Sequence, residues 1–177
     1  MKNTTLLSYC RPRANGIIAL GLREDDRLIR VTLTDGNSQM LVASYNGKVV
    51  RFSEDTVRPM GRTATGVRAI KLDEDDQDRV IGMICVEEGS KESVLVISEK
   101  GFGKRTDLDD ENGEPIYRIT NRGDKGVKTM NLTDKTGNLI GLDAVNDDMD
   151  LMLITKAGTA IRMAMNTISV LGRATQG

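Results

Sequence analysis

The chain of 177 residues contains no histidine and no tryptophan, and its aromatic residues are three tyrosines and two phenylalanines. Without histidine, the chain can form neither a Cys/His zinc site nor a histidine-based general acid or base. Its two cysteines, Cys10 and Cys85, are too few for a disulfide framework or a metal ligand set. We therefore expect neither a metal site nor a catalytic residue on this chain.

Long apolar runs are also missing. No apolar stretch approaches 18 residues, and residues 1–5 lack the apolar segment of a signal peptide. Hydrophobic residues make up 38% of the chain, which is enough for a packed core built mostly from Val, Ile, Leu and Met. We expect a soluble cytoplasmic protein forming one domain.

Two short motifs recur through the sequence. In the first, a turn glycine is followed four residues later by an arginine, as in Gly47 and Arg51, Gly101 and Arg105, and Gly158 and Arg162. The second is an Arg-x-x-x-Gly block, which begins and ends at Arg62 and Gly66, Arg122 and Gly126, and Arg173 and Gly177. A looser copy lies at Arg13–Gly16. Recurrence at about 50 residues indicates one supersecondary unit used repeatedly, in the range of propeller repeats.

Each repeat contains four short apolar, β-branched runs separated by polar turns, which predicts four strands per repeat. The Asn46-Gly47 pair is a strong hairpin signal, because both residues tolerate a positive φ. No segment of ten or more residues has a helical period, so the fold class is all-β. The predicted strands are 17–20, 28–33, 40–45 and 48–52; then 67–72, 79–86, 93–98 and 103–106; and then 127–132, 138–145, 151–155 and 159–163.

The repeats divide the chain into one partial array of blades. Residues 1–13 are interpreted as the end of a preceding blade, and residues 173–177 as the start of a following one. Complete blades are predicted at 14–61, at 62–121 with an acidic insertion, and at 122–172. Repeat modules bury their faces against their neighbours, so both ends of such an array should expose sheet surface or strand edges.

Opposite charges are segregated along the chain, although the formal net charge is only −1. Acidic residues gather in linkers, at 24–26, 73–76, 109–111 and 147–148. Basic residues dominate residues 47–71, and residues 156–173 contain bases but no acids. Such segregation can leave a basic stripe on a nearly neutral protein, so a polyanion is the first partner to consider.

Several of these segments, in the same order, resemble the C-terminal domain of the DNA gyrase A subunit. They are R-P-R-A-N-G-I-I-A-L at 11–20, G-K-V-V-R-F at 47–52, M-G-R-T-A-T-G-V at 60–67, G-F-G-K-R-T at 101–106 and I-S-V-L-G-R-A-T-Q-G at 168–177. The resemblance implies a β-pinwheel, a propeller-like ring of four-stranded blades. The family's wrapping determinant, a Q-R-R-G-G-K-G box, is absent from this chain, and residues 122–126 are its nearest relative.

The resemblance also implies a function. The family wraps duplex DNA, without sequence preference, around the outer rim of the ring, so that the parent type II topoisomerase can introduce negative supercoils using ATP. The implied partners are the remainder of the gyrase A subunit together with the gyrase B subunit, in a heterotetramer in the bacterial cytoplasm. No cofactor is expected on this segment, because the ATP and Mg²⁺ sites and the nicking tyrosine belong to other parts of the enzyme.

The candidate phosphate contacts are basic residues in or after the hairpin turns, because Lys and Arg neutralise phosphates regardless of sequence. The first candidates are Lys48, Arg51, Lys104, Arg105 and Arg162, and the next are Arg68, Lys71, Lys125 and Lys128. For the arginines that follow the turn glycines, an alternative role is to shield an exposed strand edge. The scarcity of aromatic residues makes single-strand recognition a weaker hypothesis.

Other repeated residues are predicted to be structural. The glycines of the turns, Gly47, Gly101 and Gly158, supply a positive φ. The block arginines Arg62, Arg122 and Arg173 have two possible roles, phosphate contact or hydrogen bonds to carbonyls between blades. The glycines that close their blocks, Gly66, Gly126 and Gly177, favour the second role because they indicate a tight backbone turn.

Three alternative functions remain open. The chain could be the corresponding domain of the topoisomerase IV A-type subunit, or a propeller used only for protein contacts. An independent hydrolase has little support, because acidic pairs such as Asp75-Asp76 lie in polar linkers.

Overall fold

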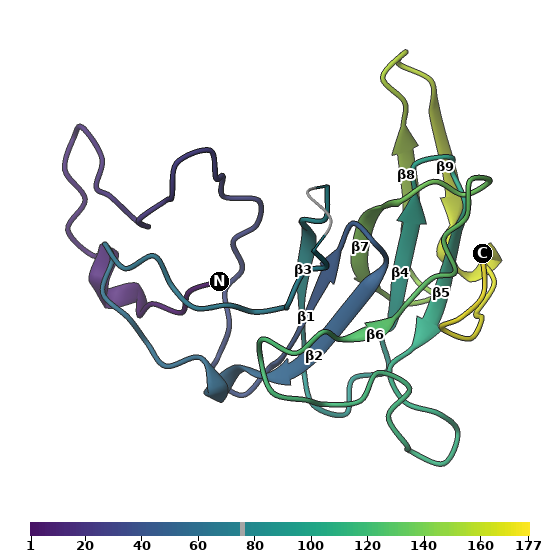
Figure 1. Cartoon of the computed structure of the whole chain (residues 1–177), viewed down its shortest axis with the longest axis horizontal. Coiled ribbons are helices and arrows are strands. Elements are labelled where there is room, and N and C mark those ends of the chain that lie inside the picture. The colour runs from purple at the N-terminus through teal and green to yellow at the C-terminus, as the bar shows by residue number, and fades with distance from the viewer. Residues whose placement is uncertain (75–76) are drawn as a thin grey trace.

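A computed structural model of the chain describes residues 1–74 and 77–177. Asp75 and Asp76, within one of the predicted acidic linkers, lie outside the described residues. The described residues form β-strands, short 3₁₀ turns and loops, and no α-helix is found among them (Figure 1). The all-β fold class predicted from the sequence is confirmed.

Every strand is short, as the alternation of apolar runs and polar turns predicts. The strands are β1 (Gln39–Ser44), β2 (Lys48–Ser53), β3 (Val80–Val86), β4 (Ser93–Ser98), β5 (Gly103–Asp107), β6 (Val127–Lys128), β7 (Leu139–Val145), β8 (Asp150–Ile154) and β9 (Ala160–Ala164). The 3₁₀ turns are η1 (Leu6–Tyr9), η2 (Glu54–Thr56) and η3 (Met165–Thr167).

The first two sheets combine strands from different repeats. The strand orders are β3-β1-β2-β6, β5-β4-β7 and β8-β9. The hairpin β1–β2 therefore pairs with β3 from the following repeat, and the hairpin β4–β5 pairs with β7 in the same way. Both of these pairings are antiparallel, and their registers shift at equivalent points, between Ala43 and Ser44 and between Ile97 and Ser98. The boundaries of the sequence repeats therefore do not coincide with the boundaries of the sheets.

Three of the predicted strands are not strands in the structure. Residues 17–20, 28–33 and 67–72 have no ladder pairing, and β6 covers only the first two residues of the predicted strand 127–132. The backbone of residues 67–72 bonds instead to other loops, through Val67 N–H to Met1 O and Lys71 N–H to Asp124 O, both at 2.8 Å. Residues 28–33 occupy the place in their repeat that β3 and β7 occupy in theirs, but no hairpin in the described chain pairs with them.

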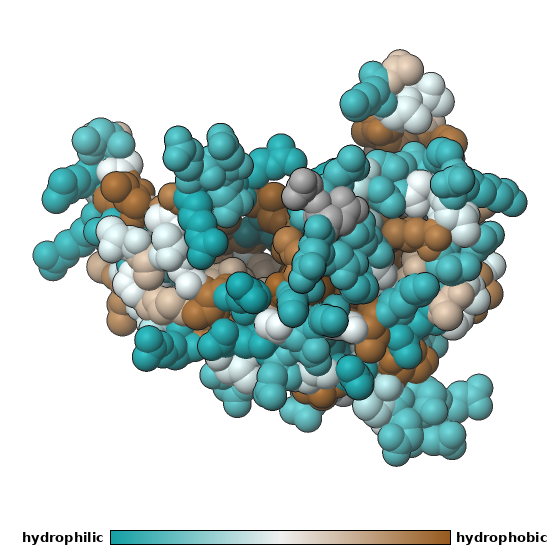
Figure 2. All heavy atoms as spheres, in the orientation of Figure 1, coloured by the Kyte–Doolittle hydropathy of each residue, from teal (hydrophilic) through white to brown (hydrophobic). Residues whose placement is uncertain are grey.

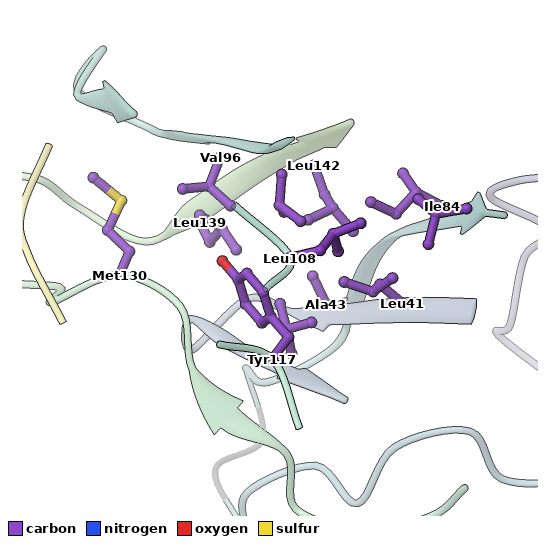
Figure 3. Close-up of a cluster of buried hydrophobic side chains, with 12 residues drawn as sticks. Leu41, Ala43, Ile84, Val96, Leu108, Tyr117, Met130, Leu139 and Leu142 are labelled. Atoms are coloured by element: carbon purple, nitrogen blue, oxygen red, sulfur yellow. The ribbon is translucent and has the colours of Figure 1, made fainter. Parts of the chain in front are cut away.

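The largest hydrophobic cluster lies between the first two sheets (Figure 3). It includes Leu41, Ile84, Leu139 and Leu142, and the loop residue Tyr117 is fully buried within it. The Tyr117 hydroxyl forms a 2.6 Å hydrogen bond with the hydroxyl of Thr129, so its polar atom is satisfied inside the core. Burial also raises the pKa of Tyr117. This cluster fixes the first two sheets against each other.

The other face of the first sheet covers a second cluster, which contains Met40, Val42, Val50 and Phe52. With apolar packing on both faces, β1 is buried along its whole length. The β8–β9 hairpin, in contrast, projects from the body of the molecule (Figure 1). Figure 2 shows hydrophobic spheres beneath a tip of mixed hydropathy.

Candidate nucleic-acid interface

Arg51, a first-choice candidate, is buried in the interior. Only 4% of its surface is exposed, although it lies on β2 directly after a hairpin turn. Its Nε donates to Gln39 Oε1 at 2.7 Å, and its Nη1 donates to the carbonyls of Leu108 and Tyr117 and forms an ion pair with Asp109 at 2.9 Å. The guanidinium thus links β2 to a loop of the following repeat.

Arg105 has the equivalent role on β5. It is 5% exposed, its Nε donates to Ile168 O at 3.0 Å, and its Nη1 pairs with Asp147 at 2.6 Å. The backbones match as well: Thr120 N–H donates to Arg51 O and Leu171 N–H donates to Arg105 O, each at 2.8 Å. The repeated arginine therefore holds the loop that packs on its strand.

Lys104 is also fully buried. Its ammonium group donates to Arg173 O at 2.8 Å, to Thr175 Oγ1 at 2.9 Å and to Gly172 O at 2.5 Å. Burial lowers the pKa of Lys104 to about 8, and the nearby Arg173 charge acts in the same direction. Lys104 thus ties β5 to the loop at 172–175.

These contacts require a revision of the site predicted from the sequence. Arg51, Lys104 and Arg105 satisfy their charges inside the protein, so a phosphate could reach them only if the inter-repeat contacts opened. We assign them a structural role and no longer count them as candidate phosphate contacts. The alternative role, in which an arginine shields an exposed strand edge, does not apply to Arg51 and Arg105 either, because both side chains are buried.

Arg162 occupies the same repeat position on β9 but is exposed. Its Nε donates to Asp150 Oδ2 at 2.9 Å, and its Nη2 forms an ion pair with the same carboxylate. Asp150 lies at the position that Gln39 occupies beside Arg51 in the first hairpin. No loop of the described residues covers Arg162, which remains accessible to an anion.

The block arginines donate to backbone carbonyls of other repeats. Arg62 Nη1 donates to Ile18 O at 3.0 Å, and Arg173 Nη1 donates to Lys128 O at 3.1 Å. Arg122 Nε donates to Thr56 O at 3.0 Å. These contacts match the second role considered for the three arginines, which is to donate hydrogen bonds to carbonyls between blades.

The block glycines permit close backbone contacts. Gly66 and Gly126 have φ values of 96° and 73°, and a Cβ on them would lie 2.1 Å from Met1 O and 2.4 Å from Val49 O. No side chain fits at those distances, so the preceding strand or segment can pack directly on the glycine backbone. The remaining repeated glycines, Gly47, Gly101, Gly158 and Gly177, also have positive φ values.

Five of the predicted contacts gather at one side of the first sheet, and we call them the basic cluster: Lys48, Arg68, Lys71, Lys125 and Lys128. Lys48 and Lys128 are cross-strand partners on β2 and β6. The segments that carry the other three run side by side, because Gly123 N–H donates to Ala69 O at 2.6 Å and Lys71 N–H donates to Asp124 O. A depression in the surface is lined by Lys71 and Lys125 together with Leu72, Asp73 and Glu74.

The basic cluster also contains acidic groups. Lys48 forms an ion pair with Asp73, and the hydrogen bond from Lys48 lowers the pKa of Asp73. Lys48 is half-buried, whereas Arg68, Lys71, Lys125 and Lys128 are exposed. The four exposed bases are therefore the cluster's strongest candidates for an anionic ligand.

The N-terminal segment shows a repeated contact that the sequence analysis missed. Lys2 Nζ donates to Arg62 O and Ala19 O, and Thr4 donates to Met60 O, much as Lys104 and Thr106 contact the loop at 171–175. The signal was the match between Lys2-Asn3-Thr4 and Lys104-Arg105-Thr106. Residues 1–5 thus pack on the loop at 57–67 as β5 packs on the loop at 168–177.

Neither a metal-binding cluster nor a membrane-spanning helix is found within residues 1–74 and 77–177. No group of three or more His, Cys, Asp or Glu side chains there could hold a metal ion. None of the helices in that part of the chain has the length and apolar character needed to cross a membrane.

Repeated antiparallel sheets that exchange strands and are linked by buried arginines define a propeller-like repeat protein. Comparison with known proteins identifies the family of this repeat protein. The sequence profile of the family described as "DNA gyrase C-terminal domain, beta-propeller" matches residues 11–35, 39–87, 92–146 and 150–177. The chain belongs to this DNA gyrase C-terminal domain family.

Individual relatives agree with that assignment. The chain is 42% identical over all 177 residues to the DNA gyrase A subunit of Staphylococcus epidermidis and 43% identical to that of Staphylococcus aureus. It spans only 19% of the length of each relative. The fold is similar to two solved structures, both 24% identical to this chain. The match to the C-terminal domain of DNA topoisomerase IV has a TM-score of 0.87 and covers 99% of this chain and 52% of that structure's chain. The match to the DNA gyrase A C-terminal domain has a TM-score of 0.79 and covers 92% of this chain and 53% of that structure's chain.

Proposed function

We propose that the chain is a DNA-binding module of a gyrase A subunit, and that it binds the duplex backbone through the basic cluster. The observation that carries this proposal is the convergence of two segments distant in the sequence, one with Lys71 and the other with Lys125 and Lys128, onto one exposed surface. Lysine and arginine side chains there can neutralise phosphates and release counterions, a contribution to affinity that does not depend on sequence.

The repeat supports a role in bending DNA. Arg68 and Lys128 occupy the same position in successive repeats, two residues after the block glycine, and both are exposed. Bending a duplex smoothly through 40–90° costs on the order of 1–6 kcal/mol, so a bending surface needs contacts spread along an arc. Arg68 and Lys128, one in each of two successive repeats, supply two contacts of this kind.

The proposed role in the parent enzyme rests on the similarity to gyrase A subunits. In the parent enzyme, the module would wrap DNA so that a type II topoisomerase introduces negative supercoils using ATP. Its partners would be the remainder of the gyrase A subunit together with the gyrase B subunit, in a heterotetramer in the bacterial cytoplasm. ATP and Mg²⁺ would be bound by other parts of that enzyme.

The test is a titration of labelled duplexes of several sequences at several salt concentrations. We expect similar affinities for all sequences and an affinity that falls steeply with salt. Combining Lys71→Glu, Lys125→Glu and Lys128→Glu should abolish binding. The matched control is Arg23→Glu, Lys91→Glu and Lys156→Glu, which makes the same change in net charge at exposed residues outside the cluster.

Equal loss of binding in both triple variants would contradict the assignment of the site, because net charge alone would then explain it. Absence of binding by the unchanged chain would favour a propeller used only for protein contacts. A module of the topoisomerase IV A-type subunit is a second candidate function, favoured by the TM-score of 0.87. The 42% identity to a gyrase A subunit over the whole chain favours gyrase.

A further inference from the structure

Within the basic cluster, the ammonium group of Lys48 is already paired with an anionic side chain. It forms an ion pair with Asp73, which lies two residues after Lys71. The hydrogen bond from Lys48 is the largest cause of the lowered pKa of Asp73, and the charges of Lys48 and Lys125 act in the same direction. The Asp73 carboxylate therefore lies in the positive field of the cluster, where a DNA phosphate would also be attracted.

A second carboxylate, that of Asp78, holds Asp73 in this position. It accepts a hydrogen bond from the backbone N–H of Asp73 at 2.9 Å and another from the backbone N–H of Asn46 at 3.1 Å. Asp78 is buried, and it links the backbone of Asp73 to the hairpin turn that precedes Lys48. Asp73 is therefore placed beside Lys48 by backbone hydrogen bonds as well as by the ion pair.

The fold of the repeat does not require this ion pair. In the next repeat, Phe102 follows the turn glycine in the place of Lys48. Thr133 likewise follows a leucine in the place of Asp73. Neither charge is present there, yet β4 pairs with β5 and β7 as β1 pairs with β2 and β3. The pair is therefore a property of the surface of one repeat and is not needed to build the sheet.

The ion pair is also open to exchange with another anion. The side chains of Lys48 and Asp73 are 29% and 37% exposed, and ion pairs at such exposure contribute little because water screens them. Lys48 is the cross-strand partner of Lys128, and like charges directly opposite each other are unfavourable. An anion beside these two lysines is therefore favoured, and a phosphate can supply the negative charge as well as Asp73 does.

We propose that Asp73 is an internal competitor of DNA phosphate, which occupies the phosphate position at Lys48 and weakens duplex binding by the basic cluster. This inference rests on the proposed function and names a residue that limits the affinity of the same site. When a duplex binds, Lys48 exchanges the carboxylate for a phosphate, and Asp73 takes up a cation from solution. The net release of ions is then smaller, so the affinity and its dependence on salt are both reduced.

The test compares the duplex affinity of the full 177-residue chain with that of Asp73→Asn at several salt concentrations. Asp73→Asn should raise the affinity about tenfold at low salt, and should steepen the slope of log affinity against log salt by up to about 0.9, the value for one phosphate contact. A purely structural role of Asp73 would not steepen that slope. The matched control is Glu74→Gln, which removes the same charge from an adjacent, exposed residue that forms no ion pair among the described residues. It should raise the affinity by about twofold at most.

Two further variants complete the test. Asp73→Thr introduces the residue that the next repeat has at this position, so it should fold and should bind as Asp73→Asn does. In a chain that also carries Lys48→Met, Asp73→Asn should raise the affinity no more than Glu74→Gln does, because no ammonium group is released.

The outcomes separate this inference from the proposed function. Equal gains from Asp73→Asn and Glu74→Gln, or an undiminished gain without Lys48, would overturn the inference while duplex binding by the unchanged chain still supported the proposed function. Binding by Asp73→Asn but not by the unchanged chain would support the inference in its strongest form. Absence of duplex binding in every variant would overturn both.

Discussion

The guanidinium Nη1 of Arg51 donates to the carbonyl of Tyr117, 66 residues further along the chain, at 3.1 Å. The same nitrogen bonds to Leu108 O and pairs with Asp109, so one side chain joins a hairpin to two separate parts of the following loop. The arginine that follows each turn glycine is therefore a connector between repeats wherever a loop packs on it.

Replacing this connector should destabilise the fold. Arg51→Ala leaves two buried carbonyls and a carboxylate without their donor, and we expect the free energy of unfolding to fall by about 3 kcal/mol or more. Arg162→Ala changes the same repeat position where it is exposed, and should stay within about 0.5 kcal/mol of the unchanged chain. Urea unfolding followed by circular dichroism measures both. Equal losses of unfolding free energy in the two variants would show that burial does not determine how much each arginine contributes to stability.

Two glycines with similar φ values should differ in their tolerance of alanine. Gly158 has a φ of 83° and no heavy atom within 4 Å of an added Cβ, so Gly158→Ala should cost about 1–2 kcal/mol from backbone strain alone. Gly126→Ala should cost clearly more, because its Cβ would also lie 2.4 Å from Val49 O. Thermal unfolding of the two variants ranks them. A smaller loss at Gly126 would contradict the close packing.

The buried Lys104 should make stability depend on pH in the alkaline range. Its pKa is about 8 in the folded chain, against an ordinary value of 10.5. Between these values the unfolded chain keeps a proton that the folded chain has released, so the contribution of Lys104 to the free energy of unfolding rises with pH. Lys104→Met should remove this rise, which urea unfolding between about pH 7 and 9.5 would measure. An identical pH dependence in the variant would argue that another group titrates.

Addition of the chain to relaxed circular DNA with a nicking–closing enzyme should change the linking number little. The expected binding is weak and salt-sensitive, because few phosphates are neutralised and little bending energy is offset. The Q-R-R-G-G-K-G box, which the family resemblance makes the wrapping determinant, is also absent from the sequence. A strong shift in linking number proportional to added protein would show that the repeats present here suffice for wrapping.

Local signals in the sequence predicted the hairpins well. The limits of β4, Ser93–Ser98, are those predicted, because an apolar run is bounded by polar residues on both sides. The turn glycines also have the positive φ that Asn46-Gly47 and its equivalents indicate. These features depend on a few neighbouring residues, so the sequence contains the information directly.

The candidate site was harder to predict because it depends on distant residues. Lysine at position 104 suggests a surface residue, and only the loop at 172–175 supplies the oxygen atoms that allow its burial. Conversely, Lys71 and Lys125 come together only through the bond between the backbones of Lys71 and Asp124. Repeat position predicted which bases are equivalent, but not which of them a neighbouring repeat covers.

The exchange of strands between repeats decides where this molecule can be divided. A cut at a boundary of the sequence repeat, for example after residue 61, leaves the β1–β2 hairpin without β3, its partner along the whole of β1. A cut between β3 and β4, in residues 87–92, keeps that pairing and separates fewer hydrogen-bonded strands. The same offset means that a nascent β1–β2 hairpin cannot complete its sheet on the ribosome until β3 and β6, which belong to the two following repeats, have also emerged.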